Sequence, residues 1–141
     1  MSAILFFLED VEYTITNRES RINWISSAIA SEGENPGDIN VILCSDEYLL
    51  KMNQEYLDHN YYTDIITFDN SVNPNEISGD LFISIDRVRD NAAQIDIPEK
   101  DELDRVIIHG ILHLLGFNDK TEPEIRLMRE KEEAYLSLRK Y

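Results

Sequence analysis

The segment from Val106 to Gly116 reads VIIHGILHLLG, and it decides where the centre of this protein lies. Apolar residues occupy nearly every face of the helix that this segment predicts, which is typical of a helix packed on all sides. We therefore expect a central helix that begins near Pro98, because proline suits the first helical turn, and that stops at Gly116. His109 and His113 are four positions apart, so they lie on one face of this helix, one turn from each other.

An acidic residue follows the helix at a spacing that returns it toward the two histidines. Gly116 can adopt the left-handed conformation that reverses a chain, and Asp119 comes three residues later. A catalytic zinc site typically has three protein ligands and one open position, and the only cysteine, Cys44, offers no fourth ligand of comparable quality. We therefore predict that His109, His113 and Asp119 hold one catalytic Zn²⁺ ion per chain.

Residue 110 separates this pattern from that of the metallopeptidases. In their H-E-x-x-H helix, the residue after the first histidine is a glutamate that acts as the general base. Gly110 has no side chain for that role, so the pattern favours a hydrolase of another class. A histidine that is merely hydrogen-bonded in the core is the alternative interpretation, but two at this spacing with a following acid favour metal binding.

The composition is that of one folded domain, which we expect to span residues 1–141. The hydrophobic content of 43% is enough to fill a core. The net charge of −15 argues against a protein that attracts nucleic acid through its overall field. Basic residues concentrate in the last third of the chain, where they can pair with neighbouring acids, as Glu122 can with Arg126 one helical turn later.

Two features bear on the compartment. Cys44 ends the apolar run from Ile39 to Cys44, so we expect a buried thiol without a disulfide, as is usual in a reducing compartment. The apolar start, Ile4 to Leu8, is short, lacks a basic leader and runs directly into Glu9 and Asp10, unlike a signal peptide. No other segment approaches the length of a membrane span, so we expect a cytoplasmic protein.

Periodicity and turn residues predict an α+β fold, with a small mixed four-stranded sheet covered by helices and the histidine helix at its centre. We expect a turn at Asn35-Pro36-Gly37, and Thr121 with Glu124 gives the signature of a capping box before the last helix. The last two strands are close enough in sequence to pair as a hairpin. The predicted strands cover 4–8, 39–44, 65–69 and 81–85, and the predicted helices cover 18–31, 45–56, 86–94, 98–116 and 121–139.

Residues 109–119 resemble the motif H-G-x-L-H-L-x-G-Y-D-H of the YbeY family, bacterial metal-dependent endoribonucleases that act in ribosomal RNA maturation. The resemblance extends over about residues 38–119. Three further segments carry it: Met52-Asn53 followed by Tyr56 matches L-N-x-x-Y, residues 63–68 match T-D-V-L-S-F, and residues 79–84 match G-D-I-x-I-S.

The chain departs from the family pattern at the third metal ligand. Asp119 stands where the family has histidine, and Asn118 replaces an aspartate that could support the ligands. A carboxylate lowers the net charge of the site relative to three neutral ligands, which weakens the Lewis acidity of the bound cation. It also widens the choice of metal from zinc toward Mn²⁺ or Ni²⁺.

A second departure concerns phosphate binding. Leu57 stands where the family has an arginine that plausibly helps to hold phosphate. His59 lies two residues later and is a candidate for the missing positive donor, with an exposed loop histidine as the alternative. The resemblance also places the strand after Asp64 beside the cleft, which makes Asp64 a candidate for shaping the site. Without the resemblance, Thr63-Asp64 reads as an ordinary turn.

The resemblance implies a metal-dependent endoribonuclease that cleaves single-stranded RNA in ribosomal RNA processing, with the small ribosomal subunit as partner. We favour a monomer. Two alternatives stay open: a ribosome-associated assembly factor with a structural metal and weak or no catalysis, and a peptidase or other zinc hydrolase. A basic cleft around the metal favours the nuclease, whereas an acidic cleft favours the assembly factor. The sequence does not name a general base.

Overall fold

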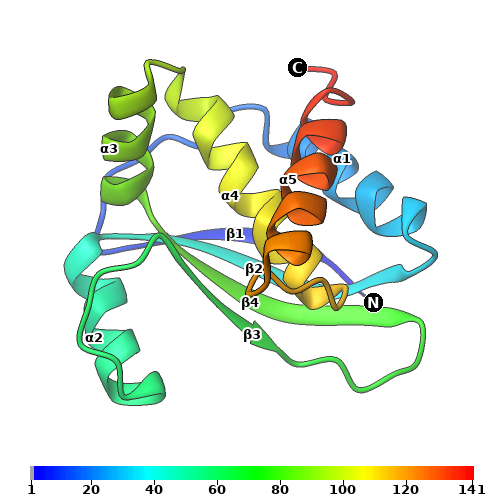
Figure 1. Cartoon of the computed structure of the whole chain (residues 1–141), viewed down its shortest axis with the longest axis horizontal. Helices are drawn as coiled ribbons and strands as arrows, with labels where there is room; N and C mark the ends of the chain where they lie inside the picture. The colour runs from blue at the N-terminus through cyan, green and yellow to red at the C-terminus, as the bar shows by residue number, and fades with distance from the viewer. Residues whose placement is uncertain (1) are drawn as a thin grey trace.

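The computed structural model describes residues 2–141, which form five helices and four strands (Figure 1). The predicted α+β class is confirmed. In chain order the elements are β1 (Ile4–Glu9), α1 (Arg18–Ser31), β2 (Asn35–Cys44), α2 (Asp46–Leu57), β3 (Ile65–Asp69), β4 (Glu76–Ser84), α3 (Ile85–Ile95), α4 (Glu99–Leu114) and α5 (Glu122–Leu136).

The four strands form one mixed sheet in the order β1-β2-β4-β3. β1 pairs with β2, and β2 with β4, in parallel, whereas β3 and β4 form the predicted antiparallel pair. Side chains alternate between the two faces of a strand. Leu81 and Ile83 of β4 therefore point into the main core, while Phe82 between them faces the opposite layer.

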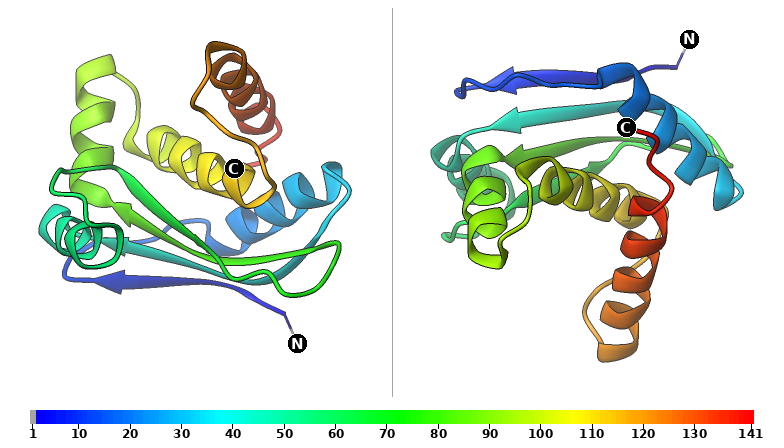
Figure 2. Two further views of the ribbon diagram at one scale, coloured as in Figure 1. Left: turned by 60° about the horizontal axis from the view of Figure 1, so that its bottom comes forward. Right: turned by 90° about the horizontal axis from the view of Figure 1, so that it is seen from above.

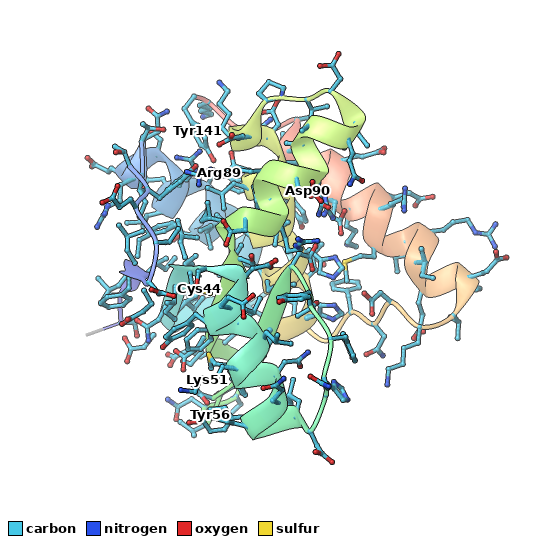
Figure 3. The ribbon with its side chains drawn as sticks, turned by 90° about the vertical axis from the view of Figure 1, so that its left-hand side faces the viewer. Cys44, Lys51, Tyr56, Arg89, Asp90 and Tyr141 are labelled. Carbon is cyan, nitrogen blue, oxygen red and sulfur yellow. The ribbon has the colours of Figure 1, made fainter. Side chains whose placement is uncertain are left out.

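The helices divide unequally between the two faces of the sheet (Figure 2). α1, α3, α4 and α5 contribute to the main core on one face, and α2 covers a smaller apolar cluster on the other. Figure 3 views the molecule from the end where α2 and α3 lie, and it labels Lys51 and Tyr56 on α2 and Arg89 and Asp90 on α3. Cys44 lies in the α2 cluster as a fully buried free thiol, as predicted, and burial raises its pKa to about 12.

The predicted central helix is α4. Its apolar residues lie in the main core between the sheet, α1, α3 and α5, with Ile107, Ile108 and Ile111 fully buried.

Among residues 2–141, no helix combines the length and the apolar character that a membrane crossing requires.

α4 lies close to the sheet at Gly110. A Cβ atom at this position would come within 2.7 Å of the Ile65 side chain and 2.9 Å of the Leu81 side chain. The residue in the position of the peptidase glutamate therefore faces the apolar sheet and not the histidine face of the helix. A glutamate here would bury its carboxylate against Ile65 and Leu81, which is costly without a partner.

Two predicted boundaries were wrong. The expected turn at Asn35-Pro36-Gly37 is the first part of β2, which pairs with β4 across a register shift between Pro36 and Ile39. The chain reverses earlier instead, at Gly33, where φ is +82°. Ile85, expected at the end of a strand, begins α3 because the Ser84 side chain accepts a hydrogen bond from the Arg87 backbone N–H and caps the helix.

Three basic residues of the last third, Arg105, Lys131 and Arg139, form ion pairs with acids among the described residues, and those of Lys131 and Arg139 join distant parts of the chain. Lys131 of α5 lies 2.9 Å from Glu32 at the end of α1. Arg139 lies 2.8 Å from Asp104 of α4. The predicted pair between Glu122 and Arg126 is not among the ion pairs within 4.0 Å that residues 2–141 form. Tertiary packing, and not helical spacing, selects these partners.

Candidate metal centre

The two histidines and the aspartate bring three donor atoms together. His109 Nε2 lies 3.0 Å from His113 Nε2, and Asp119 Oδ2 lies 3.3 Å and 3.4 Å from these two nitrogens. Within residues 2–141, these three side chains are the one group of histidine, cysteine or carboxylate residues arranged closely enough to hold a metal ion. All three are partly exposed, so the donors face an opening and not the closed core.

The local structure explains how Asp119 reaches the histidines. α4 ends in two hydrogen bonds, from Gly116 N to the carbonyl oxygen of His113 at 3.0 Å and from Phe117 N to that of Leu112 at 3.0 Å. Gly116 has φ of +98°, so the chain turns back here without strain. The other end of the connection is fixed by the predicted capping box of Thr121 and Glu124, which begins α5. Asp119 therefore lies in a short connection that is held at both ends.

The donor set fits a small divalent cation. A tetrahedral zinc ion with ligand bonds of about 2.0–2.1 Å places its ligand atoms about 3.3–3.4 Å apart. The measured separations of 3.0, 3.3 and 3.4 Å are close to these values. Two imidazoles and one carboxylate suit zinc, and they also suit manganese or nickel. The structure therefore contains a site whose donors could hold a divalent metal ion.

The sequence analysis missed a carboxylate behind the first histidine. His109 Nδ1 lies 2.6 Å from Oε2 of Glu132, a residue of α5 that is only 5% exposed. Glu132 lies on the buried stripe of α5 between Met128 and Tyr135, at intervals of four and three residues. An acid in the apolar stripe of an amphipathic helix was the signal that could have drawn attention to it.

Glu132 in turn contacts Arg105 of α4. Arg105 Nη1 lies 3.5 Å from Glu132 Oε1, and the same guanidinium makes two shorter hydrogen bonds to Glu102, at 2.8 Å and 2.7 Å. The hydrogen bonds that Arg105 donates to Glu102 hold the pKa of Arg105 above its usual range. This set of residues therefore links α4 and α5 directly behind His109.

The structure brings Asp64 and His59 to the same cleft as the three donors. This cleft has a volume of about 590 Å³ and lies between α4, β3 and the loop after α2. His59 is exposed at its edge, with Nδ1 2.9 Å from the Tyr61 hydroxyl. Asp64 lies 3.7 Å from Arg105, which is its ion-pair partner. Both candidates therefore line the site, but neither contacts His109 or His113 directly in the hydrogen bonds and ion pairs described.

The cleft is not basic. Its lining contains three aspartates, Asp64, Asp69 and Asp119, and none of the described residues that line it is lysine or arginine. A second cleft of about 600 Å³ meets the site from the α5 side and mixes Arg105 and Arg129 with four acids. The basic cleft that would favour a nuclease is therefore absent from the described residues around the donors. Arg105 and Arg129 of the second cleft supply positive charge on the α5 side of the donors, whereas positive charge inside the first cleft would require a bound cation.

Comparison with known proteins gives the family. A sequence model described as "Endoribonuclease YbeY" matches residues 8–139. The chain belongs to the YbeY family. This confirms the resemblance predicted from the histidine motif, and it supports the predicted endoribonuclease function. It also agrees with the metal-binding arrangement of the donors, since the first two histidine positions of the YbeY motif, His109 and His113, are among them.

Individual relatives match over nearly their whole length. The chain is 53% identical to the endoribonuclease YbeY of Cytophaga hutchinsonii over 98% of this chain and 96% of that protein. It is 47% identical to the endoribonuclease YbeY of Flavobacterium psychrophilum, over 96% of each chain. Among solved structures, a Thermotoga maritima protein studied in solution matches with a TM-score of 0.65 and 25% identity, over 96% of this chain and 87% of the other. The overall fold is thus shared with a known structure.

Proposed function

We propose that this protein is a metal-dependent endoribonuclease that cleaves single-stranded RNA during ribosomal RNA processing. The observation that carries the proposal is the convergence of His109, His113 and Asp119 at an open cleft, in a chain of the YbeY family. We assign Zn²⁺ as the metal, with Mn²⁺ or Ni²⁺ as alternatives because one ligand is a carboxylate. When bound, the cation supplies Lewis acidity that stabilises negative charge developing on a phosphoryl oxygen.

The side chains of the cleft would divide the remaining work. His109, His113 and Asp119 hold the cation, and the rigid packing of α4 fixes the two imidazoles. His59, at the edge of the cleft, can donate a hydrogen bond to a phosphate oxygen, in the role that Leu57 cannot perform. Asp64 fixes the start of β3 against Arg105 and so shapes the wall of the cleft. No general base is assigned.

RNA can bind in this acidic cleft only if the bound cation contributes to the binding. A phosphodiester entering a cleft with three aspartates is repelled unless positive charge is present. We therefore expect binding of RNA in this cleft, and not only its cleavage, to depend on the metal. The proposed partner is RNA of the small ribosomal subunit, and the proposed compartment is the cytoplasm. The hydrolase domain would span residues 1–141.

The test is RNA cleavage measured with the purified protein before chelation, after chelation and after zinc is restored. The His113→Ala variant, purified in the same way, controls for contaminating nucleases. We expect cleavage that is lost on chelation, regained with zinc and absent from the variant. Cleavage at the full rate by His113→Ala would overturn the proposal.

Two observations favour a second candidate, a ribosome-associated assembly factor with a structural metal and weak or no catalysis. The cleft lacks basic residues, and Leu57 replaces the family's arginine. This candidate predicts that the metal-loaded protein binds ribosomal RNA or the small subunit without cleaving it. Measuring binding and cleavage on the same RNA separates the two functions.

A further inference from the structure

The imidazole of His109 is held from both sides. Its Nε2 atom faces the donors of His113 and Asp119, and its Nδ1 atom lies 2.6 Å from Glu132 Oε2. Glu132 belongs to α5, is separated from His109 by 23 positions and is almost completely buried. A buried carboxylate requires a hydrogen-bond donor, and the Nδ1–H of a neutral imidazole supplies one.

We propose that Glu132 is a positioning residue for His109, fixing the ring so that Nε2 is the atom available to a metal. A neutral imidazole carries its single proton on one nitrogen or the other, and the hydrogen bond of one nitrogen sets the role of the second. When the Glu132 carboxylate accepts a hydrogen bond from Nδ1–H, the lone pair of Nε2 points toward His113 and Asp119. This inference rests on the proposed metal site and assigns a role to a residue outside the YbeY histidine motif.

Arg105 holds Glu132 in place. Its guanidinium lies 3.5 Å from Glu132 Oε1, on the oxygen that His109 does not use, and is itself fixed by two hydrogen bonds to Glu102. Both oxygens of Glu132 therefore have a partner, one from Arg105 and one from His109. The pair Glu102 and Arg105 are three residues apart on α4, so they form a support on the same helix as the histidines.

The second histidine lacks an equivalent support. Within residues 2–141, the only carboxylate that lies within 4.0 Å of a His113 ring nitrogen is that of Asp119. The side chain of His113 is also more exposed than that of His109, at 27% against 19%. A substitution of Glu132 should therefore act on the metal site through His109 and leave His113 in place.

The experiment measures the Zn²⁺ affinity of the full chain by competition with a chromogenic chelator. We expect Glu132→Ala to weaken zinc binding by about 10–100-fold, which is typical for the loss of a carboxylate behind a ligand histidine. Glu132→Gln should lose less zinc affinity, because its amide oxygen can still accept a hydrogen bond from Nδ1–H. The matched control is Glu130→Ala, which removes the same charge from an exposed position of α5 and should leave the affinity unchanged.

A second measurement separates positioning from simple docking of α5. Imidazole ¹⁵N spectra of the wild-type protein should show His109 protonated at Nδ1 both without and with zinc. A role in docking alone would lower the stability of Glu132→Ala without changing its zinc affinity, and that result would overturn the proposal. A metal-free His109 ring with a proton at Nε2 and none at Nδ1 would overturn it even if Glu132→Ala failed to fold. If His113→Ala instead retains full zinc affinity, the metal site itself is wrong.

Discussion

Two ionic clusters on α4 use the same kinds of residue and differ in what they leave available. The closed cluster consists of Arg21, Asp104, Arg139 and Tyr141, and the open cluster consists of Glu102, Arg105, His109 and Glu132. In each, an arginine and a carboxylate join α4 to other parts of the chain. The comparison shows how one helix supports both the fold and a reactive site.

In the closed cluster, donors from distant parts of the chain surround one buried carboxylate, that of Asp104. Asp104 is fully buried and accepts hydrogen bonds from Arg21 at 2.8 Å, from Arg139 at 2.8 Å and from the Tyr141 hydroxyl at 3.1 Å. Arg21, which is 1% exposed, also donates to the backbone carbonyl of Thr16 and lies over the Tyr141 ring. All of the strong acceptors and donors have partners, so this cluster only fastens α1 and the C-terminal residues to α4.

In the open cluster the chain of bonds ends at a nitrogen that faces a cleft. Glu102 holds Arg105, Arg105 approaches Glu132, and Glu132 holds one side of the His109 ring. The remaining nitrogen of that ring points to His113 and Asp119 at the edge of the cleft. The proposed function therefore depends on one donor atom that the fold orients and leaves available to a ligand.

The substitution with the largest expected effect on stability is Asp104→Ala, in the closed cluster. The substitution leaves Arg21 buried without its carboxylate, and we expect it to lower the free energy of unfolding by about 3–5 kcal/mol. Urea denaturation measures this loss. The control is Asp101→Ala, which removes a more exposed partner of Arg139 and should cost no more than about 1 kcal/mol. Equal losses in the two variants would show that the closed cluster is not the fastening that we describe.

The contribution of the candidate metal site to the free energy of unfolding should depend on bound metal and not on burial of its side chains. At a zinc concentration 100 times the dissociation constant, we expect the wild-type free energy of unfolding to rise by about 2.7 kcal/mol. His113→Ala should show no such gain, and without zinc it should unfold close to the wild-type midpoint because His113 is partly exposed. Denaturation with and without zinc measures both values. The same gain in the variant would remove His113 from the site.

The smallest effect should appear at alkaline pH and only in the closed cluster. Burial, followed by the charge of Asp104, raises the pKa of Tyr141 above its ordinary value of about 10. The unfolded chain then releases this proton at a lower pH than the folded chain, so the contribution of Tyr141 to stability is complete below about pH 10 and is lost as the pH rises above it.

Tyr141→Phe tests this dependence. The wild-type free energy of unfolding should fall more steeply than that of the variant above about pH 10, by no more than about 1.4 kcal/mol per pH unit. Denaturation curves recorded at several alkaline pH values compare the two slopes. Parallel slopes would mean that Tyr141 ionises alike in both states, and they would contradict the closed character of the cluster.

The order of elements could be predicted from the sequence because it depends on local patterns. All nine predicted helices and strands are present, and the capping box of Thr121 and Glu124 starts α5 as expected. The start of β2 could not be predicted, because Asn35-Pro36-Gly37 has the local preferences of a turn and becomes extended only through its pairing with β4. The same holds for the ion pairs of Lys131 and Arg139, whose partners come from distant elements.

Local spacing also determined the three donors of the candidate site. A separation of four residues on a helix, a reversing glycine and an acid three residues later are sufficient to bring His109, His113 and Asp119 together. The family could thus be predicted from the motifs, and the class of fold and the candidate ligands could be predicted from patterns among residues that are close along the chain.

The surroundings of those donors depend on how distant segments of the chain pack together. This packing placed Glu132 behind His109 from a helix that follows later in the chain, and it turned residue 110 against the sheet, where a peptidase glutamate would have no partner. It also gathered aspartates from β3 and from the connection before α5 into one acidic cleft. The physical reason is that burial, hydrogen-bond partners and local charge are properties of a packed environment, and segments far apart in the sequence create that environment together.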